Sequence, residues 1–190
     1  MSNISKPKTS SLPHFVLVRA VLCALFAALT AVLSQLAFNI GPVPVNLALV
    51  SVFLSVGLLG WKWGSLSQLL FLAMGALGLP VFANFKGGPD AFFGPTGGFL
   101  CGYLLCALAA GLLLDRFGRK IRVAVPAFLL GLLLCYLLGI LWFMYTKQLP
   151  LGVSLGYCVF PFLPGDAGKI ALCAFLTNRL FFLFDPQKMK

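Results

Sequence analysis

The sequence predicts an all-α integral membrane protein with six transmembrane helices. Of its 190 residues, 61% are hydrophobic and 9% are charged, and the mean hydropathy is +1.02. Soluble domains carry about 25% charged residues. The apolar residues fall into long runs, and a helix needs about 20 such residues to cross a bilayer. The length fits one membrane domain at 15–184, between polar cytoplasmic tails at 1–14 and 185–190.

The spans follow from these runs and from the turn signals between them. Trp61-Lys62-Trp63 is typical of residues at headgroup level and separates the second run from the third. The connection 81–93 is polar and glycine-rich. The connection 146–165 is apolar and proline-rich, so we expect irregular backbone that lines a cavity or is buried in protein. The predicted spans are 15–38, 45–60, 64–80, 94–114, 123–145 and 166–184.

The basic residues predict the orientation. Six spans place both termini on one side, which then receives eleven of the 14 Lys and Arg residues, against only Lys86 and Lys147 on the other. Basic residues concentrate on the cytoplasmic side of membrane proteins. Both termini are therefore predicted to be cytoplasmic, in a multi-pass protein whose connections 81–93 and 146–165 face out. The net charge of +10 has this explanation, and we do not expect a nucleic-acid partner.

An acid and a base lie in the apolar stretch PFLPGDAGK (161–169). Asp166 is one of only four acidic residues, and Lys169 lies three positions later, on the same face of a helix. A charge at bilayer depth costs about 2.5–3.5 kcal/mol on insertion scales, so it needs a partner or a function. The pair could offer an acceptor and a cation to a small ligand. Alternatively, Asp166 is an N-cap with Lys169 as its intrahelical partner.

The predicted topology brings polar groups together at the outer face. A ligand from outside would meet the 81–93 connection, the glycine pair that opens the fourth span, and the acid–base pair, with aromatic side chains as an apolar lining. The glycine pair could instead serve tight helix packing. The candidate binding residues are Asp166, Lys169, Asn84, Asn46, Gly97, Gly98, Phe92 and Tyr157.

Enzymatic and metal chemistry find little support in the composition. The chain has no Glu, its single histidine, His14, lies at the edge of the N-terminal tail, and its six cysteines are scattered without a CxxC pair. Paired acids, nucleophile–base pairs and metal-ligand sets therefore cannot be assembled in the usual ways. We expect no catalytic site, no metal and no cofactor.

Small residues recur at spacings of four in the first span, at Ala20, Ala24 and Ala28. In lipid, such a stripe lets another helix approach closely. The stripe could pack on the protein's own helices or dock a partner protein.

Four motifs together resemble the BioY family, the biotin-binding S components of energy-coupling factor (ECF) transporters. They are GPVP (41–44), GLPVFAN (78–84), GPTGG (94–98) and PFLPGDAGK (161–169). The resemblance covers about residues 15–180. Two stretches depart from the family pattern: 45–48 lacks its Thr and Gln, and Asn84-Phe85 replaces a glycine pair.

The resemblance implies an S-component fold of six helices that captures biotin with high affinity in an outward-facing pocket under a lid loop. It implies a cell-membrane location and uptake driven by two ATPase subunits and a transmembrane coupling protein, which docks on the alanine stripe. It aligns Asp166 and Lys169 with the polar pair near biotin, and Asn84 with the position before the lid. Two alternatives stay open: a solitary facilitator that works without an ATPase, and an S component for a different small vitamin.

Overall fold

The computed structural model describes residues 12–38 and 42–181. Residues 1–11 and 185–190 of the predicted tails, residues 182–184 of the predicted sixth span and the predicted turn residues 39–41 lie outside the described residues. Residues 12–14, predicted as part of the N-terminal tail, are helical. Within that part, one two-stranded ribbon accompanies the helices. The elements are α1 (Leu12–Gln35), β1 (Ala37–Phe38), β2 (Val45–Asn46), α2 (Ala48–Ala76), the 3₁₀ turn η1 (Ala83–Phe85), α3 (Pro89–Phe93), α4 (Gly97–Phe117), α5 (Ile121–Lys147), α6 (Leu151–Cys158) and α7 (Leu163–Leu180).

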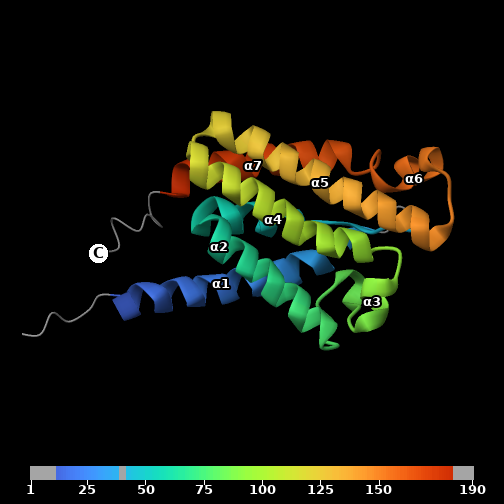
Figure 1. Cartoon of the computed structure of the whole chain (residues 1–190), viewed down its shortest axis with the longest axis horizontal. Helices are drawn as coiled ribbons and strands as arrows, with labels where there is room; N and C mark the ends of the chain where they lie inside the picture. The colour runs from blue at the N-terminus through green and yellow to red at the C-terminus, as the bar shows by residue number, and fades with distance from the viewer. Residues whose placement is uncertain (1–11, 39–41, 182–190) are drawn as a thin grey trace, which may run out of the picture.

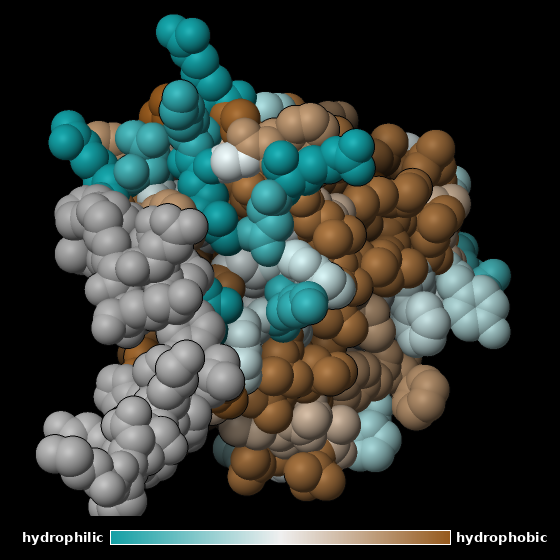
Figure 2. All heavy atoms as spheres, turned by 60° about the vertical axis from the view of Figure 1, so that its left-hand side comes forward, coloured by the Kyte–Doolittle hydropathy of each residue, from teal (hydrophilic) through white to brown (hydrophobic). Residues whose placement is uncertain are grey.

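The long helices form an elongated bundle with two different ends. The start of α1, the bend of α2, the α4–α5 connection and the last turns of α7 meet at one end, and β1–β2, α3 and α6 lie at the other (Figure 1). Hydrophilic side chains gather over the first end and apolar ones over the flanks (Figure 2). We call the first end the basic end, because it carries Lys62, Arg116, Lys120 and Arg179.

Although α2 is assigned as one helix, it is a hairpin of two arms, 48–59 and 61–76. The chain reverses at Gly60, whose φ of 84° and ψ of 176° lie outside the helical region. Gln68 Nε2 donates to Ser55 Oγ at 3.3 Å, although a straight helix would place residues 13 apart at about 20 Å along its axis. Residue 60 needs glycine, because positive φ is strained for other residues.

Within the described residues, four helices are long and apolar enough to cross a membrane: α1, α2, α4 and α5. The pair α6–α7, bent by 51°, makes a fifth if it counts as one span. The number is smaller than the predicted six because the predicted spans 45–60 and 64–80 fall into the two arms of α2.

Two connections contain more regular structure than we predicted. The segment 146–165, expected to be irregular, includes the last two residues of α5, the whole of α6 and the start of α7, and 81–93 contains η1 and α3. Pro150 is the N-cap of α6, and Pro164 lies in the first turn of α7. Proline is well tolerated at helix starts, because its missing N–H would have no intrahelical partner there. These prolines therefore begin helices and do not interrupt them.

Small residues bring α4 and α5 close together. A Cβ on Gly102 would lie 2.8 Å from Cys135 Sγ, and a Cβ on Gly131 would lie 2.9 Å from Cys106 Sγ. Both cysteines are buried free thiols. Close packing of small residues is a main source of helix association in lipid, and here it holds α4 directly against α5.

At the basic end, Arg119 joins three parts of the chain. It pairs with Asp115, donates from Nε to Gly57 O at 2.9 Å, and lies 4.1 Å from the ring centroid of Phe181. Asp115 also accepts from the N–H of Trp61 at 3.1 Å. These contacts tie the α2 bend to α4 and to the end of α7.

Candidate functional site

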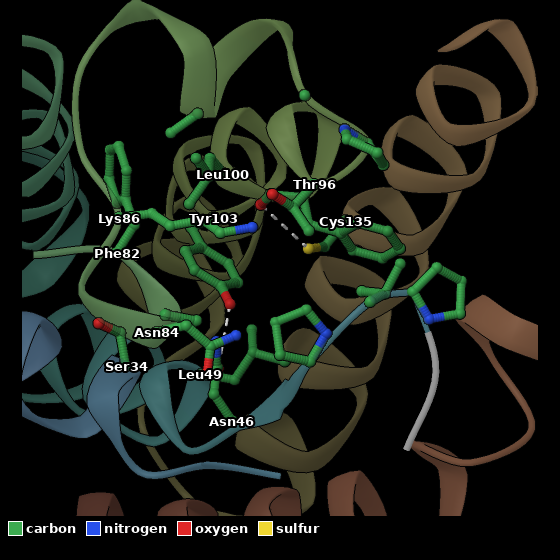
Figure 3. A pocket seen from close by; sticks show the side chains of 18 of the residues that line it. Ser34, Asn46, Leu49, Phe82, Asn84, Lys86, Thr96, Leu100, Tyr103 and Cys135 are labelled. Carbon is green, nitrogen blue, oxygen red and sulfur yellow. Dashed lines mark hydrogen bonds between the residues drawn. The ribbon is translucent and has the colours of Figure 1, made fainter. Parts of the chain in front are cut away.

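A cavity of about 790 Å³ opens between the start of α2, the 82–96 segment and the helices α4, α5 and α7. Many of its lining residues come from β2 and the 82–96 segment, at the end of the bundle opposite the basic end (Figure 1). Ligand pockets in proteins typically measure about 300–1,000 Å³. Figure 3 shows side chains from α2, the 82–96 segment, α4 and α5 around the space.

One wall of the cavity is built on a buried ion pair. Asp166 Oδ1 accepts from Lys169 Nζ at 2.7 Å, one turn apart on α7; Asp166 is fully buried, and Lys169 is 7% exposed. The second carboxylate oxygen of Asp166 accepts from the hydroxyl of Tyr136 on α5. Asp166 lies inside the first turn of α7 and not at its N-cap, which is Phe162. The N-cap alternative is therefore wrong, whereas its intrahelical pairing is present.

Asn46 extends this cluster across to α2 and α4. Its backbone carbonyl accepts from Lys169 Nζ at 2.7 Å, and its side-chain Oδ1 accepts from the N–H of Ala48 at 3.1 Å and from the hydroxyl of Tyr103 at 3.2 Å. Asn46 is thereby held at the point where β2 leads into α2. We call Asn46, Tyr103, Tyr136, Asp166 and Lys169 the inner polar cluster.

Aromatic rings form much of the remaining lining. Phe82 is buried and meets Phe71 and Phe92 edge-to-face, at centroid distances of 5.3 and 5.4 Å. Phe99 and Phe162 are parallel at 6.5 Å. Besides Tyr103 and Tyr136, the rings lining the cavity are Phe71, Phe82, Phe85, Phe99 and Phe162. The cavity thus combines one polar cluster with walls suited to an apolar ring.

The segment at the cavity's mouth is a tight turn anchored to the end of α1. Phe82 and Lys86 exchange backbone hydrogen bonds of 2.9 and 3.2 Å, closing the turn η1. Gln35 on α1 donates to the carbonyls of Pro80 and Phe82, at 3.2 and 3.0 Å, and accepts from the N–H of Phe85 at 3.0 Å. The turn 82–86 is therefore held both by its own backbone hydrogen bonds and by the side chain of Gln35 on α1.

The structure separates the predicted site residues into three groups. Asn46, Asn84 and Lys169 line the cavity, and Asp166 lies directly behind Lys169. Phe92, Gly97 and Gly98 line a second, apolar crevice of about 500 Å³. Tyr157 on α6 is 45% exposed and borders neither space in the described part of the chain.

The glycine pair packs against α5. A Cβ on Gly98 would overlap the side chain of Trp142, and one on Gly97 would overlap the carbonyl of Phe92. The indole N–H of Trp142 donates to Gly94 O at 2.9 Å. Of the two interpretations left open by the sequence, the geometry favours tight packing, which holds the GPTGG turn against α5.

Sequence reasoning missed Tyr103 and Tyr136, which join the cluster from α4 and α5. A signal was available: each tyrosine lies within a long apolar run, and a hydroxyl buried in lipid needs a hydrogen-bond partner. The identity of those partners was not accessible, because they lie 57 and 30 residues away in the chain.

The alanine stripe of α1 faces outward. Ala20, Ala24 and Ala28 are all exposed, whereas Cys23 and Ala27 on the neighbouring face are buried. Large apolar side chains on the outer face are also exposed, with Leu17 at 62% and Leu25 at 59%. The stripe is thus available to lipid or to another protein.

Comparisons with known proteins agree with these observations. A family model described as the BioY family matches residues 6–185. A biotin transporter BioY of Thermotoga maritima is 37% identical over 157 residues, covering 82% of this chain and 91% of that protein. A probable biotin transporter BioY of Pyrococcus horikoshii is 40% identical over 164 residues, covering 84% and 93%. A crystal structure of the S-component for biotin from an ECF-type ABC transporter matches with a TM-score of 0.82 and 29% identity, covering 89% of this chain and 96% of that one.

Proposed function

Because the chain belongs to the BioY family, we propose that it is the biotin-binding S component of an ECF transporter and captures biotin with high affinity for uptake. The observation that carries the proposal is the cavity of about 790 Å³ with the inner polar cluster in its wall. We expect no cofactor and no catalysis, with biotin itself as the transported ligand.

The ureido ring of biotin suits the inner polar cluster. It has two N–H donors and one carbonyl acceptor. An ammonium group has three N–H donors, of which Lys169 uses two on Asp166 and Asn46, so a third can serve the ureido carbonyl. The hydroxyl oxygens of Tyr103 and Tyr136 can accept from the ring N–H groups. In this arrangement, Asp166 acts mainly by positioning Lys169 and Tyr136.

The thiophane ring and the hydrocarbon chain of biotin suit the aromatic walls. Apolar surface removed from water contributes about 25 cal/mol per Å², and five phenylalanine rings line the cavity. Asn84, on the anchored turn at the mouth, would contact the part of the ligand nearest the opening.

We propose that each arm of α2 is a membrane span and that α6–α7 is a bent span, which gives the six spans predicted from the sequence. The basic end then faces the cytoplasm with both termini, and the cavity faces outside. The distribution of Lys and Arg supports this orientation through the positive-inside rule, and the hydrophilic side chains of Figure 2 lie at the corresponding end. The location would be the cell membrane.

We further propose that the exposed face of α1 around Ala20, Ala24 and Ala28 docks the transmembrane coupling protein, which carries two ATPase subunits. Small residues four apart permit close helix approach, and the stripe is exposed along the bundle. Replacing Ala24 with Leu is expected to block assembly without reducing biotin binding.

The experiment is binding of labelled biotin to the detergent-purified chain, in competition with desthiobiotin, riboflavin and thiamine. We expect saturable binding displaced only by biotin and desthiobiotin. Displacement by another vitamin, or no binding by folded protein, would contradict the ligand assignment. Uptake of biotin by cells that express this chain without any coupling module would instead identify a solitary facilitator.

A further inference from the structure

We propose that Lys86 binds the carboxylate of the ligand and makes the site selective for ligands with an acid end. This inference rests on the proposed function and deepens it. It follows from the distribution of charge in the cavity, from the anchoring of the turn that carries Lys86, and from the direction of its side chain.

Lys169 is not available to neutralise a ligand carboxylate. Its charge is already balanced by Asp166 at 2.7 Å, and a further bond holds it to the Asn46 carbonyl at 2.7 Å. A second anion beside the pair would leave a net negative charge in a buried space, which is costly. The inner polar cluster is therefore suited to the neutral, polar end of a ligand, and the acid end must find its cation elsewhere.

Lys86 supplies that cation at the mouth of the same cavity. Its side chain points into the space (Figure 3) and contributes to the lining. Among the described residues, it makes no ion pair within 4 Å and donates no side-chain hydrogen bond. An ammonium group that is directed into a cavity and has no counter-ion can donate charge-assisted hydrogen bonds to an anion that binds there.

The backbone beneath Lys86 is held in place before any ligand arrives. The paired hydrogen bonds with Phe82 fix its N–H and its carbonyl, and Phe82 is itself buried between two other rings. The N–H of Gly88, two residues later, donates to Gly75 O at 2.7 Å. Only the lysine side chain has to order on binding, which limits the entropic cost of the contact.

Lys147 is the competing cation, since it also lines the cavity. It lies in the last turn of α5, where a basic residue interacts favourably with the helix C-terminus. That interaction gives Lys147 a structural role, whereas the geometry gives none to the Lys86 ammonium. Asp90, the acid among the described lining residues, forms no ion pair within 4 Å with Lys86 or Lys147.

The test compares biotin with biotinamide, its uncharged analogue, on purified variants. We expect Lys86→Gln to weaken biotin binding by about tenfold, which is the low end for a charge-assisted contact at an exposed position. Binding of biotinamide should be unchanged. Lys86→Arg should keep most of the affinity for biotin, and Lys62→Gln, at the basic end, is the control for the loss of a positive charge elsewhere. The difference between the two ligands should shrink at high salt.

Three results would overturn the inference. Equal losses for biotin and biotinamide in Lys86→Gln would mean that the lysine only supports the turn. A selective loss in Lys147→Gln, with Lys86→Gln unaffected, would move the acid-binding role to α5. Normal biotin binding by Lys86→Gln would exclude this lysine from the carboxylate contact. Failure of the unmodified chain to bind either compound would instead contradict the proposed function itself.

Discussion

Replacing Asp166 with Asn should destabilise the protein by leaving a buried cation without its counter-ion. Lys169 is 7% exposed, and its two hydrogen bonds go to the Asp166 carboxylate and to the neutral Asn46 carbonyl. At an effective dielectric constant of about 20, two charges about 4 Å apart attract by about 4 kcal/mol. Removing one partner of a buried ion pair typically costs about 3–5 kcal/mol. The two figures agree, so we expect a loss of that size in the free energy of unfolding.

The assay is denaturant-induced unfolding of the purified protein in detergent, followed by circular dichroism, with biotin binding measured on the same samples. Asp90→Asn is the matched control: it makes the same chemical change at an exposed acid, where substitutions usually stay within about 0.5 kcal/mol.

The double variant Asp166→Asn with Lys169→Met separates stability from binding. Removing both charges together is often close to neutral for stability, so the double variant should regain most of the lost free energy. It should still fail to bind biotin, because the donor that faces the cavity is gone. A double variant as unstable as Asp166→Asn would refute the unpaired-charge reasoning, and normal binding by the double variant would refute the role of the pair in the site.

Three further substitutions test other parts of the structure. Gly98→Ala should cost about 1–3 kcal/mol of stability, because the new methyl overlaps a side chain of α5; Gly152→Ala, with open space around it, should not destabilise the protein in the same unfolding assay. Gln35→Ala removes the anchors of the mouth turn, so trypsin should cleave after Lys86 faster than in the unmodified chain; an unchanged rate would contradict that anchoring. Arg119→Ala should lower the free energy of unfolding by about 1–2 kcal/mol, and a neutral result would mean that its contacts at the basic end contribute little.

The sequence predicted those parts of the fold and site that depend on neighbours along the chain. Asp166 and Lys169 lie three residues apart, so helical geometry alone placed them on one face, and the structure pairs them. Gly60 and the Trp61–Trp63 stretch marked a reversal, and the chain does reverse there. Spacing also placed Ala20, Ala24 and Ala28 on one face of a helix, but whether that face is covered by the protein's own helices or exposed was decided only by the structure, in which all three are exposed.

Contacts between distant segments were harder to predict. Tyr136 reaches Asp166 only because α5 packs beside α7. Asn46 was a candidate binding residue, and its side-chain Oδ1 does accept from Tyr103, but the group that meets Lys169 is its backbone carbonyl, which any residue would provide. Tyr157 was chosen as a loop aromatic, but residues 151–158 form a helix that carries it away from the cavity. Such outcomes depend on where a chain turns in space, which hydropathy does not encode.

The late start of α2 has a consequence for how a small membrane protein makes room for a ligand. Its first arm begins at Ala48 and bends at Gly60, so it covers roughly 18 Å at 1.5 Å per residue, against a hydrocarbon core of about 30 Å. The residues before this arm, 42–46, are not helical, and four of them line the cavity. A helix of full length would fill this space with its own side chains. The proposed binding volume therefore lies where further turns of the first arm of α2 would otherwise be.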